Sequence, residues 1–251
     1  FFENCATRIR DVLADVLKNK LVFDKNFVYN PHTFRQLIQK NVHWNSWGSF
    51  GIDLAIGAVV DRNASSWEHQ FLPEYIFKAL EKGQIKRGLG ATDLVKKTSI
   101  LNKKLAKEKS ETLLMSPFFI ISLLAFIILG VTFKDYQNNS RSRWMDSGLY
   151  ALTGIIGVFL ILLWFATDHF ATQNNYNLLW AFPLSLFFAI EITKQNPKYW
   201  VKKYIMFQIL MLLLMCIHWI TGVQSYPVVL LPLLTALGIR YIFIFNFLNK
   251  K

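Results

Sequence analysis

The sequence is short of several residue types, and each shortage excludes a class of protein. Its 251 residues contain only two cysteines, 12 glycines and seven prolines, which excludes a disulfide-rich mini-protein and a collagen-like chain. Acidic residues are also few, with 16 Asp and Glu against 28 Lys and Arg. Because 53% of the residues are hydrophobic, the chain is not intrinsically disordered either.

Several chemical signatures are missing as well. None of the five histidines has metal-site spacing to another histidine, a cysteine or a carboxylate. The sequence has no glycine-rich nucleotide-binding loop and no G-x-S-x-G nucleophile elbow. We therefore expect neither a metal ion nor a cofactor.

Charge and hydropathy divide the chain near Ser116. Residues 1–116 contain 18 Lys and Arg and 12 Asp and Glu, whereas the longer remainder contains only 10 and four. A membrane-spanning helix needs about 20 mostly apolar residues. We predict an outer domain over residues 1–116 and a five-helix transmembrane domain over residues 117–251. The expected spans are Pro117–Phe133, Leu149–Thr167, Leu178–Thr193, Tyr204–Gly222 and Val228–Leu248.

The loops between the expected spans predict the orientation. Those on one side of the bundle, with the C-terminus, carry nine Lys and Arg, and those on the other side carry none. The positive-inside rule places the lysine-rich side in the cytoplasm. Five spans then place residues 1–116 outside the cytoplasm, so that nucleic acid is not an expected partner.

Three ionisable residues fall within the expected spans, where such residues are functional candidates by default. Glu191 is close enough to a span end to reach the interface, and His218 suits a neutral, hydrogen-bonded interior position. Arg240 lies too deep in its expected span for its side chain to reach the membrane surface easily. It either pairs inside the bundle or binds a lipid phosphate.

The polar half begins with a helix that carries the first cysteine. Apolar residues recur at helical spacing from Cys5 to Leu17, Asn4 is a suitable N-cap, and Cys5 falls in the first turn. The positive end of a helix favours the thiolate, and Arg8, three residues on, adds positive charge. Cys5 is therefore either a nucleophile or a small core residue.

Two further helices are expected in this half. One runs from Phe34 to about Lys40, and one begins at Ser65 or Ser66 and runs to Lys82, with Pro73 tolerated in its first turns or at a kink. The basic stretch 82–109 is expected to be solvated. In the other half, Asp168 and His169 lie in a loop without Lys or Arg, on the side expected to face outward with Cys5, where His169 is either a site residue or a loop residue without a role.

A family resemblance rests on six short motifs that span most of the chain. The sequence resembles the bacterial family that includes the lipoprotein N-acyltransferase Lnb, whose members carry an Asn-Cys-Thr or Asn-Cys-Ala-Thr motif. The matching segments are Asn4-Cys5-Ala6-Thr7-Arg8, Thr33-Phe34-Arg35, Phe50-Gly51-Ile52-Asp53-Leu54-Ala55-Ile56-Gly57, Phe71-Leu72-Pro73-Glu74-Tyr75, Thr167-Asp168-His169 and Asn177-Leu178-Leu179-Trp180. The sequence departs from that pattern at Phe170, where relatives often have proline, and at His69.

The resemblance implies an outer α+β domain with a circularly permuted papain-like or NlpC/P60-like thiol fold. By that resemblance Cys5 is the nucleophile, with Asn4, Thr7, Arg8, Asp168, His169 and Arg240 as supporting or substrate-binding candidates. The general base in such enzymes is a histidine upstream of the cysteine. Because the chain begins without Met and a helix is already under way at Cys5, we expect a C-terminal part of a longer protein, with that fold incomplete at its N-terminus.

The implied function is acyl transfer through a Cys5 thioester between envelope lipids and lipoproteins. It would take place in the bacterial inner membrane, with residues 1–116 in the periplasm and the C-terminus in the cytoplasm. One alternative is a membrane-anchored cysteine hydrolase, an amidase or peptidase that uses water as acceptor. Another is a non-catalytic subunit of an envelope complex.

Overall fold

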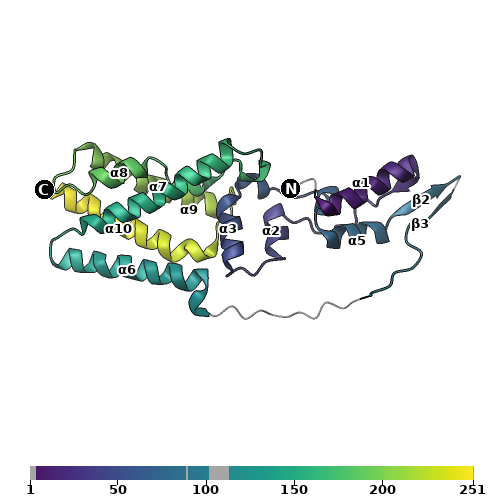
Figure 1. Ribbon diagram of the computed structural model, residues 1–251, viewed down its shortest axis with the longest axis horizontal. Helices are drawn as coiled ribbons and strands as arrows, with labels where there is room; N and C mark the ends of the chain where they lie inside the picture. Colours follow the sequence, from purple (N-terminus) through teal and green to yellow (C-terminus); the bar gives the residue numbers. More distant parts are fainter. Residues whose placement is uncertain (1–3, 89, 102–112, 251) are drawn as a thin grey trace. The chain divides into compact units, whose positions relative to one another are not determined.

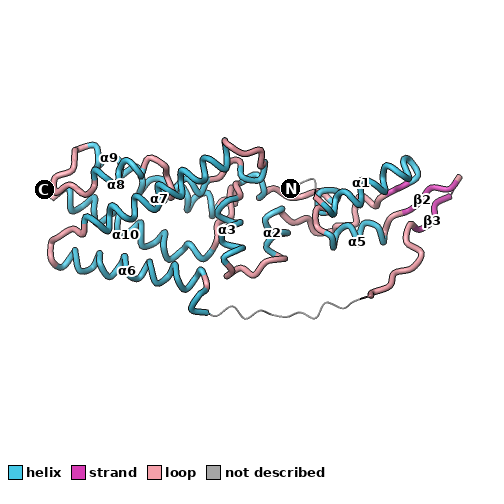
Figure 2. Tube along the Cα trace, in the orientation of Figure 1, coloured by secondary structure: helices cyan, strands magenta, loops and turns pink. Residues whose placement is uncertain are grey.

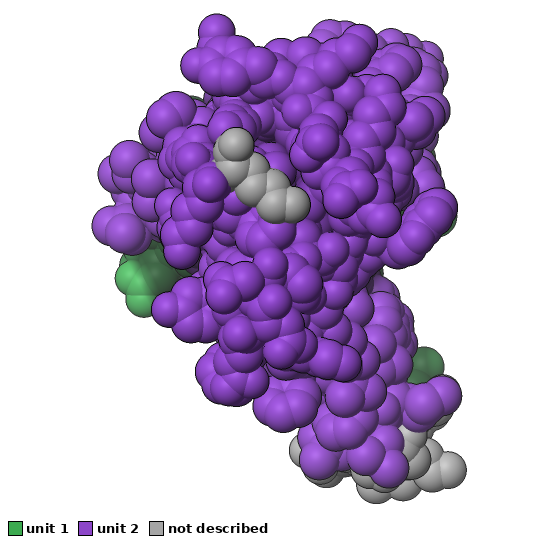
Figure 3. All heavy atoms as spheres, turned by 90° about the vertical axis from the view of Figure 1, so that its left-hand side faces the viewer, with its two compact units in different colours: residues 1–40, 62–110 green, residues 41–61, 111–251 purple. Residues whose placement is uncertain are grey.

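A computed structural model describes residues 4–88, 90–101 and 113–250 of the chain (Figure 1). The chain forms two compact units, each built from two stretches of sequence (Figure 3). Unit 1 contains residues 1–40 and 62–110, and unit 2 contains residues 41–61 and 111–251. Residues 41–61, expected in the outer domain, therefore belong with the long apolar helices.

Unit 1 combines short helices with a small sheet, drawn in Figure 2. The three strands form an antiparallel sheet in the order β1-β2-β3, in which Leu21 pairs with Ile85 and Ile85 with Thr92. Its elements are α1 (Cys5–Leu17), a 3-10 turn (Lys18–Lys20), β1 (Leu21–Val22), α2 (Phe34–Gln39), α4 (Ser66–His69), α5 (Pro73–Glu81), β2 (Gln84–Arg87) and β3 (Gly90–Asp93). The described part of the unit is thus α+β, but it does not establish the thiol-enzyme fold implied by the resemblance. Part of the expected basic stretch, residues 102–109, lies outside the described residues.

The expected long helix from Ser65 or Ser66 to Lys82 is wrong, because the structure divides it into α4 and α5. Pro73 is the first residue of α5, where its missing N–H costs no helical hydrogen bond. Proline also disfavours helical geometry at the residue before it, and Leu72 is extended. A proline that the sequence allowed as a kink therefore starts a new helix.

Unit 2 is dominated by four long helices. They are α6 (Pro117–Gln137), α7 (Arg143–Phe165), α9 (Trp200–Ile220) and α10 (Leu231–Asn249). Counting the 3-10 turn Val228–Leu230 with α10, each is long and apolar enough to cross a membrane. Their outer faces expose large apolar side chains such as Phe126, Ile155 and Leu210, the reverse of a soluble protein. These helices confirm a helical membrane domain.

The third expected span, Leu178–Thr193, is not one long helix. It contains the end of a 3-10 turn (Tyr176–Leu179), an irregular stretch around Pro183, and the seven-residue helix α8 (Ser185–Glu191). The segment is irregular where its main chain lies very close to two glycines of α7. A Cβ atom on Gly157 would lie 2.1 Å from the Ala181 carbonyl oxygen, and one on Gly154 would lie 2.5 Å from the Leu186 nitrogen.

This broken segment still runs the length of the bundle. Near its start, Asn177 donates hydrogen bonds to the backbone of Asp53 and Leu54. After its end, the carbonyls of Thr193 and Lys194 accept from Arg143 and Arg141, beside the opposite end of α7. Trp180, Ala181 and Phe188 are buried, as expected of irregular backbone that is shielded by protein at membrane depth.

The remaining elements of unit 2 join residues 41–61 to one end of the bundle. They are α3 (Trp47–Ala55) and 3-10 turns at Ala58–Val60, Leu113–Met115 and Phe170–Thr172. The amides of Gly57 and Ala58 donate to the carbonyls of Ala171 and Asn174, both at 2.9 Å. A Cβ atom on Gly57 would lie 1.9 Å from the Gln173 carbonyl oxygen, so only glycine fits there.

Candidate functional site

Cys5 is the first residue of α1, and its side chain is exposed. Asn4 caps the helix: its Oδ1 accepts from the amides of Ala6 at 2.9 Å and Thr7 at 3.0 Å. The Thr7 hydroxyl in turn accepts from the Asn4 amide at 2.8 Å. A side-chain hydrogen bond from Asn4 Nδ2 to the Phe71 carbonyl ties this end of α1 to the residues before α5. The start of the helix that bears Cys5 is therefore firmly placed within unit 1.

The cap also determines which amides remain available beside the thiol. The Asn4 side chain occupies the amides of Ala6 and Thr7, and the Asn4 carbonyl accepts from Arg8. Among the described residues, the Cys5 amide has no acceptor, so it is the first-turn donor free to face a negative oxygen. Asn4 and Thr7, named from the sequence as candidates, thus hold the cap, and Arg8 is exposed on the same helix.

An exposed apolar stripe runs along α1 from Cys5. Ile9, Val12 and Val16 follow Cys5 at helical spacing on one face, and their exposed fractions are 56%, 59% and 72%. The face that packs inside the unit is different and contains Ala6, Thr7 and Arg10. The Arg10 guanidinium lies 3.9 Å from the centre of the Trp67 ring, so a cation–π contact holds it there.

The two histidines that unit 1 contains are engaged with each other. His69 is fully buried, with Nδ1 2.8 Å from the Ser65 carbonyl and Nε2 accepting from the His32 amide at 3.4 Å. Burial lowers the pKa of His69, and the hydrogen bond that its Nδ1 donates to the Ser65 carbonyl opposes that change. His32 Nε2 lies 2.9 Å from Lys40 Nζ. Within the described part of unit 1, no contact joins either imidazole to Cys5.

Asp168 and His169 lie in unit 2, in the exposed loop that follows α7. The main chain of His169 begins the 3-10 turn Phe170–Thr172: its carbonyl accepts from the Thr172 amide and hydroxyl. The imidazole itself is solvent-exposed. The structure therefore assigns the main chain of His169 a local role and leaves its ring accessible.

Arg240 pairs inside the bundle, the first of its two expected alternatives. Its side chain is fully buried; Nε donates to Asp146 Oδ1 at 2.7 Å, and Nη1 lies 2.8 Å from Asp135 Oδ2. Arg141 Nη1 lies 3.6 Å from Asp146 Oδ2. These four side chains, from α6, α7, α10 and the α6–α7 loop, form a neutral buried charge cluster, which is the arrangement that buried ions require.

The sequence did not single out Asp135 and Asp146. Asp135 also accepts from the amide and hydroxyl of Ser142, both at 2.8 Å, so it closes the loop between α6 and α7. One signal in the sequence could have indicated them: two apolar helices each have an acidic residue near one end, and a third contains an arginine. The spacing in the sequence does not show that Asp146 and Arg240, 94 residues apart, pair in the folded chain.

The other two ionisable candidates in the expected spans have simple surroundings. Glu191 pairs with Lys194 at 2.6 Å, close to the end where it was expected to reach the interface. The ring of His218 packs edge-on against Tyr176, with centroids 4.8 Å apart. The expected hydrogen bond is absent at His218 Nδ1, which is buried and has no partner in the described residues.

A buried amide cluster at the α3 end of the bundle also escaped the sequence analysis. Asn175 Nδ2 donates to the carbonyls of Leu54 and Ala55, and Gln224 Oε1 accepts from the Tyr176 amide. Asn177 Oδ1 accepts from Trp180 Nε1 at 3.1 Å. Together these amides satisfy the main chain where residues 41–61 meet the bundle.

Neither a disulfide nor a metal cluster is present among the described residues. Cys5 and Cys216 are both free thiols, and no group of three or more His, Cys, Asp or Glu side chains in residues 4–88, 90–101 and 113–250 is placed to hold a metal ion. The arrangement at Cys5 suits thiol chemistry: an exposed sulfur at a capped helix start, beside an amide that has no acceptor among the described residues.

The long apolar helices with lipid-facing side chains define a helical membrane protein. The Lnb transmembrane domain family matches residues 107–251, more than half of the chain, and the chain therefore belongs to that family. This confirms the resemblance seen in the sequence and places the chain in a membrane family linked to lipoprotein modification. No curated protein and no solved structure matches the chain.

Proposed function

We propose that the protein is a membrane-bound thiol acyltransferase that moves an acyl chain through a thioester on Cys5. The observation that carries this proposal is the exposed thiol at the head of the exposed stripe Ile9, Val12 and Val16. An acyl chain attached to the Cys5 sulfur can lie along these side chains and remove both surfaces from water. The stripe rises about 16 Å from Cys5 to Val16 at 1.5 Å per residue, comparable to a long acyl chain.

The reaction has two steps that use the same sulfur. In the first, the Cys5 thiolate attacks the ester carbonyl of a membrane lipid or lipoprotein; a thioester forms, and the released alcohol takes a proton. In the second, an amine attacks the thioester; an amide forms, and the sulfur regains its proton. The Cys5 amide, which has no acceptor among the described residues, is the donor for the negative oxygen in both steps.

The membrane unit supports this proposal because both proposed substrates are anchored in lipid. The four long helices and the broken segment 176–193 make five passages along the bundle, so the C-terminus ends opposite the start of α6. With the lysine-rich end in the cytoplasm, unit 1 acts at the outer surface of the bacterial inner membrane. Diacylated lipoproteins and phospholipids are the substrates that this surface offers.

The decisive experiment compares Cys5→Ser with the wild-type protein in a bacterial host that lacks its own lipoprotein N-acylation. Mass spectrometry of a lipoprotein's N-terminal peptide should show the added acyl chain only with the wild-type protein, and a trapped acyl adduct should map to Cys5. Cleaved peptide with unchanged acylation would point instead to a cysteine hydrolase. Acylation retained in Cys5→Ser would overturn the assignment of the nucleophile.

The stripe can be tested separately from the thiol. Ile9→Asn should lower acylation at least about tenfold, because about 1.5–3 kcal/mol of apolar contact with the chain is lost. Ile100→Asn is the matched control, since Ile100 is an exposed isoleucine of the same unit at 75% exposure. Because both sites are exposed, both variants should fold as the wild type does. Equal activity of the two variants would mean that the acyl chain does not use the stripe.

A further inference from the structure

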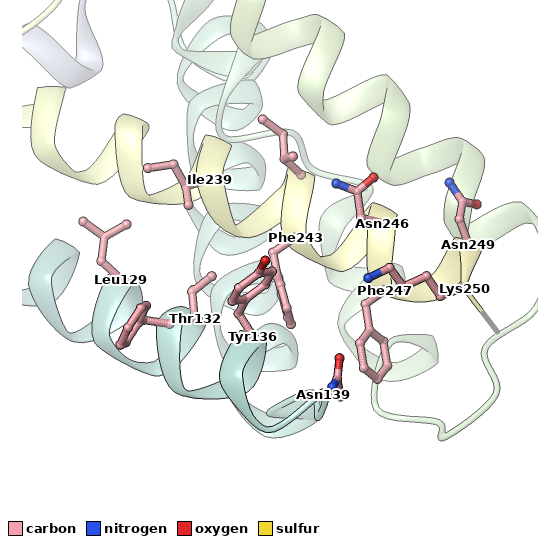
Figure 4. A pocket seen from close by; sticks show the side chains of 12 residues that line it. Leu129, Thr132, Tyr136, Asn139, Ile239, Phe243, Asn246, Phe247, Asn249 and Lys250 are labelled. Atoms are coloured by element: carbon pink, nitrogen blue, oxygen red, sulfur yellow. The ribbon is translucent and has the colours of Figure 1, made fainter.

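A groove and a smaller hollow lie next to each other at the lysine-rich end of unit 2. The groove lies between α6 and α10 and has a volume of about 710 Å³ (Figure 4). The smaller hollow, about 320 Å³, is formed by the α6–α7 loop and the residues around it. Asn139 and Phe247 line both, so the two are continuous.

The lining changes character along this path. Toward the middle of the helices it is apolar, with side chains such as Leu129, Ile239 and Phe243. Toward the helix ends it becomes polar, and the smaller hollow contains the arginines Arg141 and Arg143. Lys250 lines the groove at the same end. None of the described residues that line the two spaces is acidic, so the polar end is matched to an anion.

One buried cation in the smaller hollow lacks a complete set of hydrogen bonds. The Arg141 side chain is only 2% exposed, and its Nη2 donates to the Lys194 carbonyl at 2.8 Å. Its Nη1 lies 3.6 Å from Asp146 but makes no hydrogen bond within the described structure. A buried guanidinium nitrogen without an acceptor is costly, so Arg141, which borders the hollow, has an unused donor beside its pairing with Asp146.

We propose that this composite site binds one anionic phospholipid, with its phosphate in the arginine-lined hollow and an acyl chain in the groove. An occupant with one apolar part and one anionic part fits both linings. A free phosphate would leave the groove empty, and an apolar helix would leave the cations unmatched. Each of the two spaces is within the range of about 300–1,000 Å³ that is typical of small-molecule sites. The site is separate from Cys5, so its occupancy does not depend on acyl transfer.

The test is native mass spectrometry of the complete protein released from nanodiscs that contain equal amounts of phosphatidylglycerol and phosphatidylcholine. The wild-type protein should retain phosphatidylglycerol in preference to phosphatidylcholine. In the double variant Arg143→Gln with Lys250→Gln, the ratio of retained phosphatidylglycerol to phosphatidylcholine should fall about tenfold. Each surface cation near an anionic lipid contributes on the order of 1 kcal/mol. Lys203→Gln, an exposed lysine that lines neither space, is the control and should bind as the wild type does.

A second variant tests the groove without changing charge. Ile242→Trp should fill the apolar part and lower phosphatidylglycerol retention, whereas Ile155→Trp on the exposed face of α7 should not. Competition by glycerol phosphate, which has no acyl chain, should not displace the lipid. Equal retention of both lipids by the wild type, displacement by glycerol phosphate, or a lipid-free dimer with the groove at its interface would each overturn the proposal.

Discussion

At the scale of single residues, the structure separates groups that hold the fold from groups that are free to react. Asn4 and Thr7 are used by the cap of α1, and the Arg240 guanidinium by two carboxylates. Cys5 is exposed, and its amide has no acceptor in the described structure. Of the residues that the sequence proposed for the site, Cys5 therefore keeps its chemistry available, while its neighbour Asn4 fixes its position.

Replacing Arg240 tests the buried charge cluster. Arg240→Met would leave Asp135 and Asp146 buried without their main counter-ion, which should destabilise the membrane unit by about 3–5 kcal/mol. Thermal unfolding of the protein in detergent, followed by tryptophan fluorescence, measures the loss. Arg240→Lys keeps the charge but cannot bind both carboxylates in the same geometry. Its unfolding midpoint should therefore lie between those of the wild type and Arg240→Met. A midpoint for Arg240→Met equal to that of the wild type would show that the cluster adds no stability.

At the scale of elements, the limits of α1 could be predicted from local signals, whereas packing that depends on distant residues could not. The limits of α1 follow from an N-cap, a helical period and a lysine-rich end, all within neighbouring residues. The face of α1 that packs does not follow from them, because Arg10 is buried by Trp67, 57 residues further on. Similarly, the break in the third expected span depends on two glycines of α7 that admit a neighbouring main chain.

The close approach on α7 predicts opposite effects for two alanine substitutions in the same helix. Gly148→Ala meets nothing within 4 Å and should stabilise the helix by about 0.5–1 kcal/mol. Gly157→Ala would press a methyl group into the Ala181 carbonyl and should destabilise the unit by about 1–3 kcal/mol. Thermal unfolding in detergent compares the two directly. Similar midpoints would mean that the segment after Trp180 does not lie against α7.

At the scale of the whole molecule, the side on which each end lies depends on how many times the chain runs along the bundle, and not on the number of long helices. Four helices are long enough to span a membrane, and an even number would return the chain to its starting side. The segment 176–193 adds a fifth passage, because its two ends contact opposite ends of the bundle. The sequence predicted a fifth spanning helix here, whereas the structure has a broken segment that runs the length of the bundle, since hydropathy reports burial from water and not backbone geometry.

Because α6 is long and apolar enough to cross a membrane, Cys5, which precedes it in the chain, and the α6–α7 loop should lie on opposite sides of the membrane. In a variant whose other cysteine is removed by Cys216→Ser, a membrane-impermeant thiol reagent should label Cys5 in intact spheroplasts. With Cys5→Ser and Ser140→Cys added, the same reagent should label the loop only after lysis, because Ser140 lies at the lysine-rich end. Labelling of both positions before lysis would place them on one side and would mean that α6 does not cross the membrane between them. Labelling of Cys5 only after lysis would reverse the orientation and remove the thiol from the surface where lipoprotein substrates are found.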